Sequence, residues 1–307
     1  MAKPTNAYDS YTAVGLREDL TDFISDISPL EAPFYDRIGS VKATGRFHEW
    51  QTDSLATATA NAYVEGESFA ATAPTPTTRY GTYTQIQVKM FAITDTQEVV
   101  DKAGRRSEMA YQMQKAAKEL KRDFEWTLLV SGITISATGA SGATNVAPIF
   151  KNVYNWQVVV DAHTGISGQA TAATITEAEF NRDLLQTAWS NGAKPNAVYV
   201  GGSLKRLISG WGTSTSRPRD MGERRRIVNV VDYYLSDFGE LEIVLDRYVA
   251  SQLMYILDDS LWKKAMLVPV RMKDIPPTGL VKNHMIWTQW GLEARNPTGN
   301  CIGYSGP

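Results

Sequence analysis

Cysteine and histidine are scarce in this chain of 307 residues, and their scarcity limits the kinds of site that it can carry. Cys301 is the single cysteine, so an intramolecular disulfide is impossible and a cysteine-based metal cluster is disfavoured. The three histidines, His48, His163 and His284, are scattered, and none belongs to a pair with the spacing of metal ligands. The composition therefore predicts a protein without a metal or another cofactor.

Long apolar runs and a strong net charge are also missing. No apolar stretch approaches the length needed to span a bilayer, and the opening residues, MAKPTNAYDS, lack the apolar core of a secretory signal. The formal net charge of −2 argues against a protein that coats nucleic acid through its overall charge. We therefore expect a soluble protein that stays in the cytosol and has no membrane partner.

A long hairpin is the first clear pattern, over residues 41–96. Two extended arms flank a tip that is rich in Thr, Ala and Pro, and the return arm TYTQIQVKMFAITDT is the clearest strand in the chain. Its alternation predicts Ile86, Val88 and Met90 on one face and Gln87 on the other. Because two strands alone are marginally stable in water, we expect this hairpin to lean on neighbouring copies. That favours an assembly subunit over a catalyst.

A long helix is predicted from about residue 104 to about residue 131. Apolar residues recur there at spacings of three and four, which gives one buried stripe. The stripe consists of Met109, Met113, Ala116, Ala117, Leu120, Phe124 and Leu128. Charged residues of both signs, Glu108 and Glu125 among them, are predicted on a solvated or inter-subunit face.

Helices and strands alternate in the second half of the chain. Thr176 and Glu179 form a capping box at the start of a helix that ends at Asn191 and Gly192, and a further helix opens at Ser203. Strands are predicted at residues 197–200, 227–234, 241–245, 254–257 and 282–295. This mixture of elements indicates an α+β protein.

The strongest charge feature is the basic run RPRDMGERRR at residues 217–226. Its arginines could contact nucleic acid or an acidic surface of a neighbouring subunit. No aromatic residue interleaves with them, so the stacking half of single-strand binding is missing. We therefore favour a solvated loop or an inter-subunit role.

The other candidate sites have simpler structural explanations. The glycines of VGGSLKRL could seat an anion at a helix start, but a turn packed close to its strand explains them better. Asp246, Asp258 and Asp259 are more typical of turns than of a metal cluster. Ser203 and Ser209 lack a nucleophile elbow and a histidine relay. We predict no catalytic residue and no enzymatic activity, with a hydrolase of unrecognised site as the alternative.

Several longer stretches, in their order and spacing, resemble one protein family over nearly the whole chain. They are PFYDRIG, FHEWQTDSL, VEGE followed by TRYGTYTQI, DKAGRRSEMAYQMQKAAKELKRDFEWTLL, TEAEFNRDLLQTAWSNGAKPNAVYVGGSLKRLIS, VVDYYLSDFGELEIVLDRY and WGLEARNPTG. The family is the tailed-bacteriophage major capsid (major head) proteins, which have the Johnson fold.

The resemblance implies a domain plan and a role. The implied parts are an N-terminal arm (1–38), an E-loop hairpin (39–98), a peripheral domain with a spine helix (99–178), an axial domain (179–270) and a C-terminal return strand of the peripheral domain (271–307). The implied role is a structural subunit that self-assembles into hexamers and pentamers of an icosahedral head. Such a head encloses double-stranded DNA without sequence specificity, contains a portal, and is assembled in the host cytoplasm.

Two features depart from the patterns of some family members. No lysine lies between Gln51 and Thr78, so the loop tip has no donor for the isopeptide bond that joins subunits in some capsids. The recognisable arm begins almost at Met1, which leaves no room for a scaffolding segment that is later removed. We therefore expect a non-covalent shell and, if scaffolding is needed, a separate scaffolding protein.

The arm, the E-loop, the basic run and the final strand supply the candidate inter-subunit contacts. These are Phe34, Tyr35, Tyr63, Glu65, Phe69, Arg79, Arg224, Arg225, Arg226, Trp287 and Trp290. Core packing is the alternative for the tryptophans, Trp262 included. The alternatives for the whole chain are an encapsulin-like compartment shell and another virion protein of the tail or decoration type.

Overall fold

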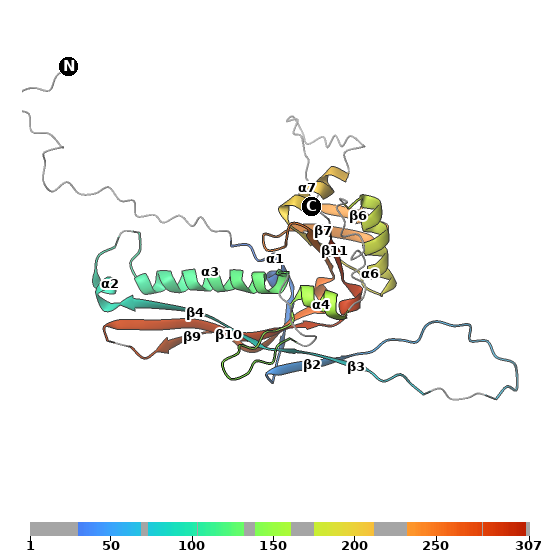
Figure 1. The fold of residues 1–307 in the computed structure, drawn as a ribbon, viewed down its shortest axis with the longest axis horizontal. Helices are drawn as coiled ribbons and strands as arrows, with labels where there is room; N and C mark the ends of the chain where they lie inside the picture. The colour runs from blue at the N-terminus through green and yellow to red at the C-terminus, as the bar shows by residue number, and fades with distance from the viewer. Residues whose placement is uncertain are drawn as a thin grey trace, which may run out of the picture.

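The computed structural model describes residues 30–68, 73–102, 104–131, 139–160, 175–211, 232–277 and 279–304. Figure 1 shows an elongated body and a rounder body, with a thin hairpin that extends away from both. Of the N-terminal arm expected at residues 1–38, residues 1–29 lie outside the described residues.

The elongated body is a four-stranded sheet with the long helix α3 (Glu108–Leu129) along it. The strand order is β1-β9-β10-β4; β1 runs parallel to β9, and the other neighbours are antiparallel. The strands are β1 (Gly39–Lys42), β4 (Gln85–Thr94), β9 (Trp262–Ile275) and β10 (Val281–Ala294). The short helices α1 (Pro33–Arg37), α2 (Asp95–Val99) and α4 (Val153–Val160) complete it.

The predicted long helix is confirmed as α3, and most of its stripe is buried. Leu120, Phe124 and Leu128 lie in the core of the elongated body. Two parts of the prediction are wrong. Ala117 is exposed, because the stripe is narrower than the spacing suggested. Glu108 and Glu125 are buried rather than solvated. The neighbouring side chains of Arg105 and Gln112 hydrogen-bond to the carboxyl of Glu108, and backbone N–H groups of the distant helix α1 hydrogen-bond to that of Glu125.

The rounder body is a five-stranded sheet in the order β11-β8-β5-β7-β6. Its strands are β5 (Ala197–Val200), β6 (Tyr233–Ser236), β7 (Gly239–Leu245), β8 (Leu253–Leu257) and β11 (Cys301–Tyr304). Its helices are α5 (Glu177–Glu179), the π-helical section η1 (Phe180–Leu185), α6 (Gln186–Ser190) and α7 (Gly202–Trp211). The short 3-10 turns η3 (Asp259–Leu261) and η4 (Pro297–Gly299) flank its last strands. The predicted capping box at Thr176 is confirmed.

One face of the sheet of the rounder body packs into the hydrophobic core of the elongated body. Residues of β5 and β8 alternate in direction, because successive side chains of a strand point to opposite faces. Tyr199 and Tyr255 pack with the aromatic cluster of the elongated body, whereas Val198 and Ile256 pack against the helices of the rounder body. The rounder body is therefore fixed to the elongated body by buried contacts rather than by a linker alone.

The hairpin is shorter than the sequence predicted. β2 (Phe47–Thr52) pairs with β3 (Thr78–Tyr83) in a separate two-stranded sheet, whereas β4 pairs with β10 in the elongated body. The predicted return arm is thus two strands that are separated by Thr84 alone. Thr84 is fully buried, and its N–H and hydroxyl both donate to the carbonyl of Arg46, at 2.9 and 3.1 Å.

Candidate inter-subunit surfaces

The tip of the hairpin is the most exposed part of the described chain. Every described residue between Asp53 and Thr77 is exposed, including Leu55 at 100%, Tyr63 at 60% and Val64 at 76%. Apolar side chains that stay exposed to water in this way carry a cost in free energy. These side chains are therefore available for burial against another molecule.

The base of the hairpin is anchored to the elongated body. The Trp50 indole N–H donates to the Ala294 carbonyl at 2.9 Å, and His48 Nε2 lies 2.9 Å from a carboxylate oxygen of Glu293. Burial opposes the charge on Glu293, but hydrogen bonds from His48 and Arg295 outweigh it and hold the pKa of this carboxyl below its usual range. The exposed tip therefore projects from a fixed stem.

An apolar row on the outer face of the long sheet is the second exposed surface. Ile86, Val88 and Met90 of β4 are 52%, 45% and 64% exposed, and the half-buried Trp287 stands opposite Val88 on β10. The alternation of this strand is as predicted, and the face that carries Gln87 is the more buried one. Gln87 is the buried residue, because its amide donates to Thr127 Oγ1 on α3 and its carbonyl accepts from the Trp290 indole, both at 2.8 Å.

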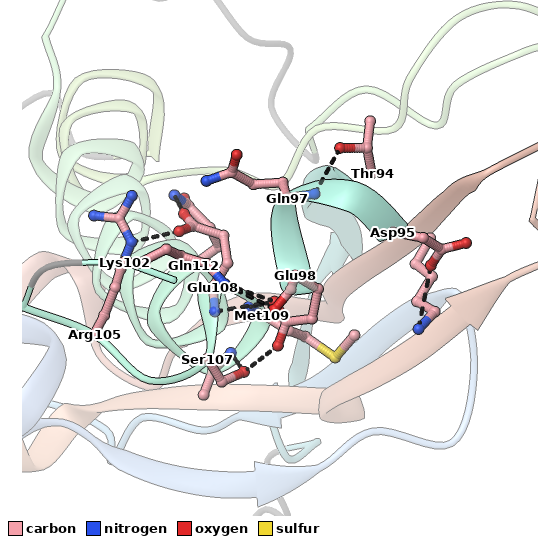
Figure 2. A network of polar contacts seen from close by, with 12 residues as sticks. Thr94, Asp95, Gln97, Glu98, Lys102, Arg105, Ser107, Glu108, Met109 and Gln112 are labelled. Atoms are coloured by element: carbon pink, nitrogen blue, oxygen red, sulfur yellow. Dashed lines mark hydrogen bonds and ion pairs between the residues drawn. The ribbon is translucent and has the colours of Figure 1, made fainter. Parts of the chain in front are cut away.

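The corner between α2 and α3 lies at the end of the elongated body opposite to the hairpin (Figure 1). Glu98 of α2 accepts hydrogen bonds from the Ser107 hydroxyl at 2.8 Å and from the N–H groups of Glu108 and Met109 at 3.0 and 3.3 Å (Figure 2). These bonds, with that of Ser107 the largest cause, lower the pKa of Glu98. The carboxylate thus satisfies free donors at the start of α3, where negative charge is also favoured by the helix dipole.

The predicted contact residues fall into four groups. Tyr63, Glu65 and Arg79 are exposed on the hairpin, where Arg79 pairs with Glu49 at 3.2 Å. Tyr35 and Trp287 are half-buried. Phe34 and Trp290 lie inside the subunit, at 0% and 1% exposed, and Trp262 is also buried. Phe69, Arg224, Arg225 and Arg226 lie outside the described residues.

Asp258 and Asp259 lie at the turn that follows β8. The Asp258 carboxylate accepts the N–H of Ser260 at a turn, and Asp259 accepts the hydroxyl of Tyr199 at 2.9 Å. Within the described ranges, no three His, Cys, Asp or Glu side chains come together as a metal site. None of the described helices is long and apolar enough to cross a membrane. Sequence reasoning placed Ile86, Val88 and Met90 on one face of their strand but did not include them among the candidate contact residues.

The arrangement of hairpin, long helix and two bodies matches that of known capsid proteins. The chain is similar in structure to the capsid asymmetric unit of cyanophage A-1(L), with a TM-score of 0.68, 11% identity, and coverage of 95% of this chain and 97% of that chain. It is also similar to the capsid of a native GTA particle, with a TM-score of 0.64, 10% identity, and coverage of 98% and 100%. The α+β Johnson fold of tailed-phage capsid proteins, expected from the sequence, is confirmed.

Sequence comparison narrows the class to one family. A family model described as SU10 major capsid protein matches residues 3–304. The chain is also 25% identical over 340 residues to the major capsid protein of Escherichia phage Phieco32, with coverage of 97% of this chain and 96% of that protein. The chain belongs to the SU10 major capsid protein family and is a structural component of a phage virion. These matches favour a capsid subunit over an encapsulin-like shell, a tail or decoration protein, and a hydrolase.

Proposed function

We propose that this subunit assembles with itself into hexamers and pentamers of an icosahedral head that encloses double-stranded DNA. The assembly takes place in the host cytoplasm with a portal and a separate scaffolding protein. The observation that carries the self-assembly is the hairpin, which has a fixed stem and a tip whose described residues are all exposed. A rigid stem lowers the entropic cost of forming a contact, so the tip is suited to lie over a neighbouring subunit.

The apolar row of β4 supplies the second contact surface of this proposal. Its three side chains and Trp287 form an apolar strip, and such strips mark protein–protein contacts when they face solvent. Burial of that strip between copies would stabilise the shell by about 25 cal/mol for each Å² removed from water, before association entropy is subtracted. Arg224, Arg225 and Arg226 remain proposed as an inter-subunit or capsomer-lining group.

The domain plan is proposed in the same terms, as an arm, a hairpin, a peripheral domain with α3, an axial domain and a return strand. The pairing of β4 with β10 supports a hairpin unit that ends near Thr84, because β4 belongs to the long sheet. The burial of β5 and β8 on both faces supports a tight joint between the peripheral and axial domains.

A deletion of the tip tests the role of the hairpin. Thr52 and Thr78 are paired at the end of the two-stranded sheet, so residues 53–77 can be replaced by Asn-Gly, which favours a two-residue turn. We expect a folded, soluble subunit that forms no closed shells in electron micrographs. A matched variant keeps the loop and changes Leu55→Ser and Val64→Ser. Normal shells from the deletion would refute a bridging role for the tip.

A substitution on the sheet tests the second surface separately. Met90→Glu places a charge within the apolar row while the backbone pairing of β4 is kept, and it should weaken shell formation and leave the subunit folded. Lys89→Gln, one position along on the other face, is the control because Lys89 pairs with Asp123 of α3 at 2.7 Å within the subunit. Unchanged assembly of Met90→Glu would remove the apolar row from the proposal.

A further inference from the structure

Two buried carboxyl groups meet where the elongated and rounder bodies join. Glu125 of α3 is 0% exposed, and Asp246, the residue after β7, is 2% exposed. Their side chains are in hydrogen-bonding contact. Burial of two negative charges side by side is strongly unfavourable, since each loses its hydration and repels the other. The assembly role of the chain does not account for this pair.

Glu125 holds the short helix α1 in place. Its two carboxyl oxygens accept the N–H groups of Phe34 and Tyr35 at 2.8 and 2.7 Å. Pro33 at the first helical position has no N–H, and Ala32 before it provides no side-chain cap. A carboxyl from α3 therefore serves as the cap of a helix some 90 residues earlier in the chain.

One buried carboxyl oxygen of Asp246 lacks a hydrogen-bond donor among the described residues. Its Oδ1 accepts the N–H of Tyr248 at 2.6 Å, but within the described chain its buried Oδ2 finds no hydrogen-bond donor. Two ionised carboxylates cannot donate to one another, whereas a carboxyl that carries one proton can. One proton shared between Glu125 and Asp246 would satisfy Oδ2 and remove one of the two buried charges.

Other titratable groups surround the pair from each packed element. They are Tyr35 of α1, Tyr199 of β5, Tyr248 after β7, Tyr255 of β8 and Lys264 of β9; Asp36 of α1 and Lys121 of α3 interact with Lys264, and Arg122 of α3 donates to the Tyr248 hydroxyl. Lys264 is the cation that interacts with Glu125, but its ammonium donates to the Tyr35 carbonyl at 2.8 Å, and burial lowers its pKa. Burial and Asp246 together raise the pKa of Glu125 to about 9.

We propose that Glu125 and Asp246 form a proton latch, in which one shared proton keeps the hook (residues 33–38) docked in the joint between the two bodies. Phe34 of the hook packs edge-on against Tyr199 of the rounder body, with ring centroids 5.2 Å apart, and against Trp262 of the elongated body at 6.3 Å. Loss of the proton leaves two adjacent buried charges, which drives the hook out and loosens the joint. The subunit thus has a closed joint at neutral pH and a loosened joint in alkali.

The direction of the pH dependence follows from proton linkage. The unfolded chain releases the Glu125 proton near the ordinary value of 4.5, whereas the folded subunit keeps it up to about 9. The stabilisation is therefore complete below 4.5, decreases as pH rises, and is lost above about 9. Between these values the folding equilibrium constant should fall about tenfold for each pH unit from this one proton.

Urea unfolding of the purified full-length subunit, between about pH 6 and about pH 9, tests the latch. Asp246→Asn keeps an oxygen for Tyr248 and gives Glu125 an N–H donor, so it should flatten the pH dependence without loss of the cap. Glu125→Gln should flatten it as well. Asp36→Asn is the control, because it removes an exposed carboxylate of the same hook, paired with Lys121 at 2.8 Å, and should keep the wild-type slope.

Cleavage by trypsin after Arg37 distinguishes release of the hook from a general loss of stability. The wild type should be cut there faster at about pH 9.5 than at about pH 7.5, after correction for the pH dependence of the protease on a peptide, and Asp246→Asn should not. The latch would be overturned if both latch variants kept the wild-type dependence of stability on pH. It would also be overturned if the wild type were cleaved after Arg37 at the same rate at both pH values.

Discussion

Truncation of Phe124 on α3 should destabilise the subunit strongly. The ring is 4% exposed and lies 5.0 Å from the ring of Tyr35 and 5.5 Å from that of Trp290. Phe124→Ala removes the ring and leaves a cavity between α3 and the sheet, which typically costs about 3–5 kcal/mol. With a urea slope of about 3 kcal/mol per molar, the unfolding midpoint of purified subunits should fall by about 1–1.7 M.

The control for this prediction lies two residues further along the same helix. Trp126 is 48% exposed, so Trp126→Ala removes a larger ring but loses less buried surface, and it should cost less than about 2 kcal/mol. Phe124→Leu should fall between the two variants, since it keeps much of the buried volume. If Trp126→Ala lowers the midpoint as far as Phe124→Ala does, the assignment of the Phe124 face of α3 as its buried face is wrong.

Three further outcomes are expected. Gly139→Ala should lower the melting temperature, because Gly139 has φ +84° and a Cβ there would lie 2.5 Å from the Ile149 carbonyl oxygen; an unchanged melting curve would contradict this. Glu98→Ala should speed amide exchange at the start of α3 and leave the end of the helix protected, whereas uniform exchange would exclude a local cap. Mature particles boiled in detergent without reductant should give one band near 33.9 kDa, because Cys301 is buried and the loop has no lysine; a ladder would reveal covalent bonds.

Local patterns predicted those elements that carry a clear signal within their own sequence. The capping box at Thr176 and the alternation of β4 are local signals, and both are present in the structure. The strand β9 carries no such signal. Its sequence WKKAMLVPVRMKDI mixes charges with Pro269, and it becomes a strand because β1 and β10 pair with it on both sides.

The burial of side chains was less predictable than the elements themselves. An apolar row on a strand indicates a face that avoids water, but it does not tell whether that face meets its own core or another molecule. The apolar row that starts at Ile86 is an example, since it is exposed in the subunit. Glu125 shows the opposite case, since its partners at Phe34 and Asp246 are distant in sequence, and its helical position alone predicts a solvated carboxylate.

The single residue between β3 and β4, Thr84, fixes the direction of the hairpin relative to the elongated body. Thr84 is held by Arg46 and also accepts the amide of Gln289 at 2.9 Å, so rotation there would break buried hydrogen bonds. The six residues of β3 span about 20 Å, so a rotation of about 10° at Thr84 would displace the far end of the strand, at Thr78, by about 3–4 Å. In the proposed shell, changes of angle between neighbouring subunits would then fall on the exposed residues 53–68 and 73–77 rather than on the stem.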